Sequence, residues 1–82
     1  MLQAISSKWQ ILRDAGYAYN FDRMVYVNRR TKKVFSVEFV EDHNESVLQQ
    51  CVNEEPNGAE WCFYFNSPPP PAVKRELENL LG

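Results

Sequence analysis

The stretch that decides the fold is residues 24–40, MVYVNRRTKKVFSVEFV, in which two apolar runs flank a basic tip. The runs cover residues 24–28 and 34–40. Both are rich in β-branched and aromatic residues that alternate with other types, which is typical of β-strands. The five residues between them, Arg29 to Lys33, are polar and suit a turn. We therefore predict an antiparallel hairpin at the centre of the fold.

The flanking sequence extends this hairpin into an α+β domain. Residues 17–19 precede a polar turn and predict another strand of the same meander, and residues 61–65 predict a fourth strand. Apolar residues at helical spacing predict helices over residues 2–14, over a stretch that starts at Asp42 or Asn44 and ends near Glu54, and over residues 71–81. The predicted order is helix, three strands, helix, strand, helix. This describes a single two-layer domain over residues 1–82, with a roughly four-stranded, mainly antiparallel sheet and three helices.

Alternation along the strands assigns each strand residue to one of two faces. The face packed against the helices is predicted to hold Val25, Val27, Phe35, Val37, Phe39, Trp61, Phe63 and Phe65. The opposite face would carry Met24, Tyr26, Ser36, Glu38, Cys62 and Tyr64. Because of its tyrosines, this face is too aromatic for a surface that contacts only solvent, so we expect it to bind another protein. The predicted interface residues are Met24, Tyr26, Glu38, Cys62 and Tyr64.

Charge is sorted along the chain. Four of the nine basic residues lie in the tip, whereas residues 34–73 contain no Lys or Arg and seven of the eleven acidic residues. This pattern favours a partner or a second copy over a uniformly solvated surface. A pI near 5.3 argues against general nucleic-acid affinity. Locally, the tip could contact phosphates or an acidic protein partner through Arg29, Arg30, Lys32 and Lys33.

Catalytic and metal-binding patterns are not found in the sequence. His43 has Asp42 and Ser46 nearby, but residues this close in sequence seldom form a proton relay, so we expect His43 to cap a helix end. Cys51 and Cys62 lack the paired spacing of a zinc site and are expected to be reduced, buried or half-buried thiols. We predict no enzymatic activity, cofactor, metal or small-molecule substrate.

Residues 24–35 resemble the second and third strands of a WW domain. The shared features are a tyrosine-containing strand, a polar turn with Thr-Lys and an aromatic third strand. Phe35 stands where that family has its binding tryptophan, and no proline follows the third strand. The resemblance therefore implies a hairpin, and it does not extend to binding of proline-rich peptides.

Together these features predict a small, acidic, non-enzymatic adaptor or accessory domain in the cytoplasm. We expect it to self-associate as a homodimer through its tyrosine-bearing face, because a small domain gains core by sharing it. One alternative is binding of the nucleic-acid backbone through the basic tip. Another is an inhibitor or immunity-type protein whose acidic flank mimics an anionic ligand. A membrane partner is not expected, since no run approaches the roughly 18 apolar residues of a span.

Overall fold

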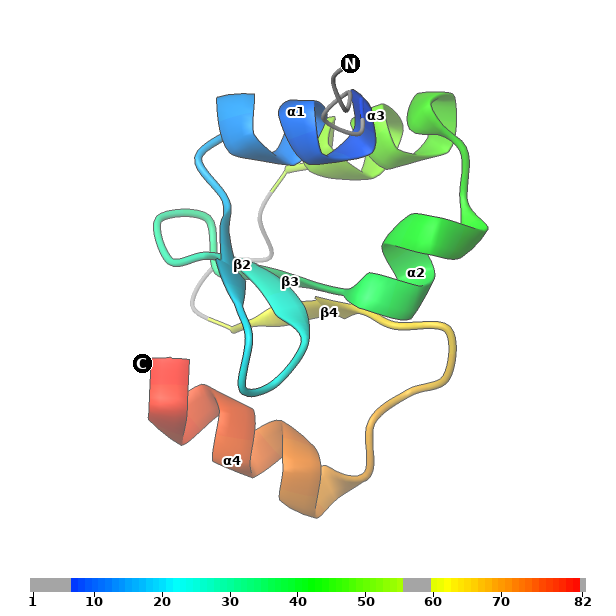
Figure 1. Cartoon of the computed structure of the whole chain (residues 1–82). Coiled ribbons are helices and arrows are strands. Elements are labelled where there is room, and N and C mark those ends of the chain that lie inside the picture. The colour runs from blue at the N-terminus through cyan, green and yellow to red at the C-terminus, as the bar shows by residue number, and fades with distance from the viewer. Residues whose placement is uncertain (1–6, 56–59, 82) are drawn as a thin grey trace.

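The computed structural model describes residues 7–55 and 60–81, in which four helices surround a four-stranded sheet (Figure 1). The helices are α1 (Ser7–Asp14), α2 (Val37–Asp42), α3 (Glu45–Asn53) and α4 (Pro71–Leu81). The strands are β1 (Ala18–Asn20), β2 (Val25–Asn28), β3 (Lys33–Ser36) and β4 (Cys62–Tyr64). The predicted α+β class and order of elements are confirmed, with α2 as an additional helix. Residues 2–6 of the predicted first helix lie outside the described residues.

The sheet is mixed, whereas a mainly antiparallel sheet was predicted. Its strand order is β1-β2-β3-β4. The first three strands form the predicted antiparallel meander, and β4 pairs with β3 in parallel. Parallel neighbours need a long crossover, which α2 and α3 supply here. As a result β1 and β4 form the two edges of the sheet.

The predicted third strand, residues 34–40, is wrong beyond Ser36. The Ser36 hydroxyl accepts a hydrogen bond from the Phe39 backbone N–H at 3.1 Å and caps α2. A serine cap followed by an acidic residue in the first turn, here Glu38, stabilises a helix start. The chain therefore leaves the sheet after Ser36, and Val40 enters the core from α2.

The junction between α2 and α3 is closed by two adjacent polar residues. The backbone N–H and the ring Nδ1 of His43 both donate to the Phe39 carbonyl, at 3.2 and 2.9 Å. Asn44 Oδ1 accepts from the Val47 N–H at 2.9 Å and starts α3. Thus the predicted capping role of His43 is confirmed, and of the two possible start residues, Asp42 and Asn44, the chain uses Asn44.

The assignment of residues to the two faces of the sheet was wrong because of the hairpin register. Asn28 pairs with Lys33, so Tyr26 lies opposite Phe35. Across the parallel pair, Phe35 lies opposite Tyr64. Since directly opposed residues share a face, Phe35 lies with the tyrosines and not with the valines of β2. A shift of one residue exchanges the two faces of a strand completely.

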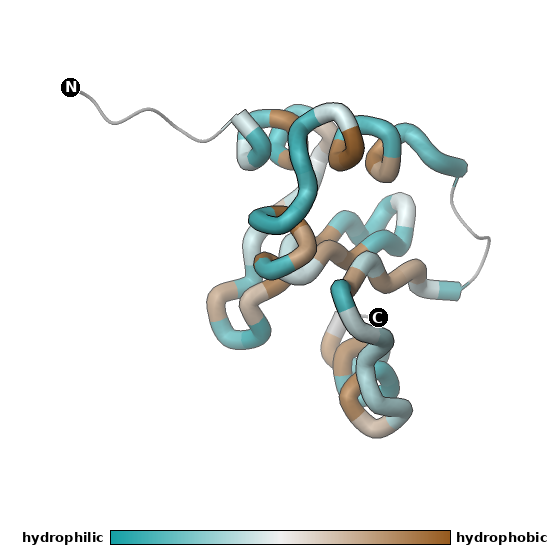
Figure 2. Tube along the Cα trace, turned by 90° about the vertical axis from the view of Figure 1, so that its right-hand side faces the viewer, coloured by the Kyte–Doolittle hydropathy of each residue, from teal (hydrophilic) through white to brown (hydrophobic). Residues whose placement is uncertain are grey.

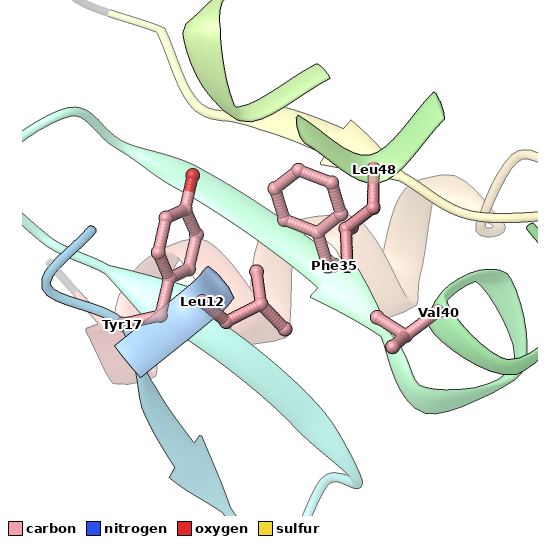
Figure 3. Close-up of a cluster of buried hydrophobic side chains, with 5 residues drawn as sticks. All are labelled: Leu12, Tyr17, Phe35, Val40 and Leu48. Carbon is pink, nitrogen blue, oxygen red and sulfur yellow. The ribbon is translucent and has the colours of Figure 1, made fainter. Parts of the chain in front are cut away.

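Apolar side chains fill both sides of the sheet. The first cluster consists of Leu12, Tyr17, Phe35, Val40 and Leu48, which Figure 3 shows converging from the sheet and the surrounding helices. The second consists of Val25, Val27, Val34 and Leu77. Helices α1, α2 and α3 cover the first face, and α4 lies against the second (Figure 1). Within the described residues, no helix is long and apolar enough to cross a membrane.

Candidate protein-interaction site

The tyrosines predicted to lie on an open face pack beneath the helices instead. The ring centroid of Tyr26 is 5.5 Å from that of Trp9 in α1. Tyr64 stacks on Phe35 with centroids 4.4 Å apart, and its hydroxyl donates to Glu54 Oε1 at 2.8 Å, just beyond α3. The prediction of an open tyrosine-bearing face is therefore wrong. The chain's own helices occupy that face.

The structure divides the five predicted interface residues between two places. Cys62 pairs with Lys33 in the sheet, so it lies with Tyr26 and Tyr64 on the helix-covered face. Met24 and Glu38 are exposed and line a common hollow of about 340 Å³ on the other side of the sheet. Of the five residues, only Met24 and Glu38 are exposed at the surface.

The four cations of the predicted basic tip also separate. Lys33 is 1% exposed, and its ammonium donates to the carbonyl oxygens of Cys51 at 2.9 Å, Val52 at 3.3 Å and Glu54. A cation in this position donates to carbonyls at the end of α3 and complements the helix dipole. Lys33 is therefore structural, and the prediction that it contacts a partner is wrong. The other three are less buried: Arg29 and Arg30 are exposed and Lys32 is half-buried.

Helix α4 covers the second face of the sheet incompletely. Among the α4 side chains that the structure describes, only Leu77 is buried. Val73 and Leu80 stay 43% and 50% exposed, although they repeat at the spacing of a core stripe. Figure 2 shows hydrophobic positions running through the sheet and recurring along α4. Part of the apolar stripe of α4 thus remains at the surface.

An ion pair joins this stripe to the turn between β1 and β2. Arg23 Nη1 lies 2.5 Å from Glu76 Oε1. Glu76 is three residues after Val73 and four before Leu80, so on the helix surface it lies between them. Met24, next to Arg23, is 55% exposed. We call these residues, Met24, Val73 and Leu80 around the Arg23–Glu76 pair, the α4 patch.

Aromatic rings of β4 and the prolines before α4 extend the apolar character of this side. Trp61, Phe63 and Phe65 are half-buried against the second core cluster. With Pro68 and Pro69 they line a hollow of about 280 Å³, where the Lys74 ammonium lies 5.8 Å from the Phe63 ring centroid. The prolines therefore share this hollow with the rings, and α4 begins at Pro71 as predicted.

The two cysteines are free and half-buried, as predicted. Burial raises the pKa of the Cys51 thiol, and the nearby Glu54 carboxylate raises it further. Cys51 therefore stays protonated at neutral pH. Among the described residues, no group of three or more His, Cys, Asp or Glu side chains could hold a metal ion.

Two tyrosines with raised pKa values make the stability of the protein depend on pH in the alkaline range. Burial raises the pKa of Tyr17 to about 12 from its ordinary 10, and burial together with the Glu54 hydrogen bond raises the pKa of Tyr64. As the pH rises, these tyrosines lose their protons in the unfolded chain before they lose them in the folded protein. Their contribution to the free energy of unfolding is therefore complete below pH 10 and decreases as the pH rises toward 12.

Urea unfolding at a series of pH values, with tyrosinate absorbance recorded on the folded protein, measures this loss. Tyr17→Phe should reduce the loss over the same range, because the substituted residue cannot ionise. If Tyr17 ionised near pH 10 in the folded protein, its burial would have no such consequence.

Comparison with known proteins finds no matching family model, no similar curated protein and no similar solved structure. Two surfaces of this fold therefore remain as candidate sites. One is the α4 patch, which sequence reasoning missed because the helical spacing of Val73, Leu77 and Leu80 does not show which of them stay exposed. The other is the part of the basic tip that remains exposed.

Proposed function

We propose that this protein is a small, non-enzymatic, cytoplasmic interaction domain that self-associates as a homodimer through the α4 patch. The observation that carries the proposal is the exposure of Met24, Val73 and Leu80 around a single ion pair. Clustered exposed apolar side chains with a polar component mark interaction surfaces in folded proteins. A chain of this size also has little core of its own, so it gains stability by burying such a surface against another molecule.

Charge favours a second copy as the occupant of the α4 patch. The first 33 residues hold seven basic and two acidic residues, whereas residues 34–73 hold seven acidic and no basic ones. A two-fold axis through either of these regions would bring like charges together. The α4 patch contains one cation and one anion, so two copies of it can face each other with Arg23 of each near Glu76 of the other.

Loss of the apolar residues tests this proposal. We expect Val73→Ser with Leu80→Ser to weaken dimerisation by at least about tenfold, because buried apolar contacts at an interface centre carry much of its affinity. Light scattering after size exclusion, over a concentration series, measures the association.

The matched control is Arg75→Ser with Asn79→Ser. These exposed residues lie two positions from Leu77 on either side, on the far face of the same helix, and their change should leave the dimer intact. A wild-type chain that stayed monomeric at high micromolar concentration would rule out the proposed self-association.

A charge exchange tests which residues meet across the two-fold axis. Arg23→Glu alone and Glu76→Arg alone each place like charges on both sides of the α4 patch, so each variant should dimerise more weakly than wild type. Mixing the two variants restores opposite charges, and heterodimers should form in preference. Native mass spectrometry of the mixture would distinguish them. Equal weakening without preferential heterodimers would mean that this ion pair acts only within one chain.

A further inference from the structure

The outer edge of β1 is a second candidate binding surface, with a hollow beside it. Among the residues that the structure describes, β1 pairs only with β2, and no strand lies on its other side. Beside it lies a hollow of about 300 Å³, whose lining is Gly16, Ala18, Tyr19, Asn20, Val27 and Arg29. The edge of a sheet presents backbone donors and acceptors that another extended chain can pair with.

Asn28 fixes two arginines at the beginning of this edge. Its side-chain amide donates to the Ala15 carbonyl at 3.0 Å, which ties the hairpin to the chain just before β1. Its Oδ1 accepts from the backbone N–H groups of Arg30 at 3.0 Å and Thr31 at 3.1 Å, which holds the turn. Gly16 accommodates this contact with φ +97°, a conformation that disfavours other residues. Arg29 lines the hollow beside β1, and Arg30 follows it in the turn that these part-buried hydrogen bonds hold.

Further charge at this end of β1 comes from α1. Arg13 is exposed in the last turn of α1, and its carbonyl accepts from the Gly16 N–H at 3.0 Å, immediately before β1. The adjacent acid, Asp14, receives a hydrogen bond from the Gln10 amide at 3.0 Å. Arg13, Arg29 and Arg30 outnumber Asp14, so this end of β1 carries net positive charge. Arginines can bind carboxylates through two hydrogen bonds.

We propose that the β1 edge binds an extended acidic segment of a partner protein by strand addition. Backbone groups of β1 would pair with the segment, and Arg29, Arg30 and Arg13 would bind its carboxylates. The proposal rests on the protein being an interaction domain, but it does not depend on self-association, which uses the α4 patch.

Binding of short peptides to the full chain tests the site. A fluorescent acetylated peptide of alternating aspartate and valine should bind, with an affinity that falls as salt is added. The same peptide with lysine in place of aspartate should not. Arg29→Gln with Arg30→Gln should weaken binding by at least about tenfold, the loss expected for two charge-assisted contacts. Lys74→Gln with Arg75→Gln changes net charge equally at α4 and should have no effect.

Backbone pairing is tested separately from charge. Amide chemical shifts of Ala18, Tyr19 and Asn20 should move on peptide addition, and methylating alternate peptide nitrogens should abolish binding. Equal binding of the lysine peptide, or unmoved β1 amides, would overturn the proposal.

Arginine-dependent binding of single-stranded DNA without peptide binding would assign the surface to nucleic acid instead. Repeating the titration with Val73→Ser, Leu80→Ser separates this result from dimerisation, because peptide binding should persist in the monomer.

Discussion

Replacing Phe35 with alanine is expected to lower the free energy of unfolding by about 3 to 5 kcal/mol, the range for deleting a buried aromatic ring. Phe35 is fully buried, and three aromatic rings surround it. The centroids of Tyr17, Phe39 and Tyr64 lie 5.4, 5.8 and 4.4 Å from its own. Because these rings come from different elements, none can fill the vacated space without leaving its own contacts.

Urea unfolding monitored by circular dichroism measures this loss. A domain of this size has a total stability of about 4 to 12 kcal/mol, so the variant is expected to be partly unfolded without denaturant. The control is Phe21→Ala, because Phe21 is 82% exposed and contacts Tyr19 at the surface, with ring centroids 4.8 Å apart. Its loss should be far smaller. Equal losses at the two positions would mean that the first core cluster is not the centre of stability.

Most helices and strands could be predicted from the sequence. The faces on which their side chains lie could not. Alternation in residues 24–28 and turn chemistry around the tip are local signals, and the hairpin they predicted is present. The short helix α2 was missed because Val37, Phe39 and Val40 suit a strand by propensity. Ser36 with Glu38 was the available signal for a helix start, and in the structure the capping hydrogen bond outweighs strand propensity.

The prediction of which strand residues share a face was wrong because apolar residues are buried on both sides of this sheet. In a sheet with one solvent-exposed side, polar residues mark the exposed side and so indicate the register. Here the adjacent residues Val34 and Phe35 point to opposite sides, and both are fully buried. Alternation alone then fits two registers equally well. The pairing of Asn28 with Lys33 decides between them, and that pairing depends on the turn and on the partners of these two side chains across the fold.

The α4 patch could not be predicted for a related reason. The stripe of Val73, Leu77 and Leu80 specifies an amphipathic helix but not how much of the stripe meets the sheet. That depends on the direction in which the prolines before α4 lead the chain away from β4. Exposed apolar residues at the end of a chain therefore become visible only when the tertiary structure is known.

Replacing Lys33 with methionine is expected to destabilise the protein by about 2 to 4 kcal/mol, although methionine keeps the length and the apolar part of the side chain. The ammonium is the hydrogen-bond donor for three carbonyls at the end of α3. Without it, these part-buried carbonyls lose a charged donor, although the Cys51 carbonyl still accepts from the Glu54 N–H at 3.3 Å. The loss of this donor carries a desolvation cost. The substitution also removes a favourable charge from the negative end of the helix dipole.

Arg30→Met is the matched control. It removes a positive charge from the same turn, but its side chain is exposed, so its effect should stay within about 0.5 kcal/mol. Hydrogen exchange gives the local readout: in Lys33→Met, amides in the last turn of α3 should exchange faster relative to those of β2. If both variants unfolded at the same urea concentration, Lys33 would be acting as an ordinary tip cation. If Lys33→Met alone is destabilised, the ammonium of Lys33 stabilises the interior of the fold.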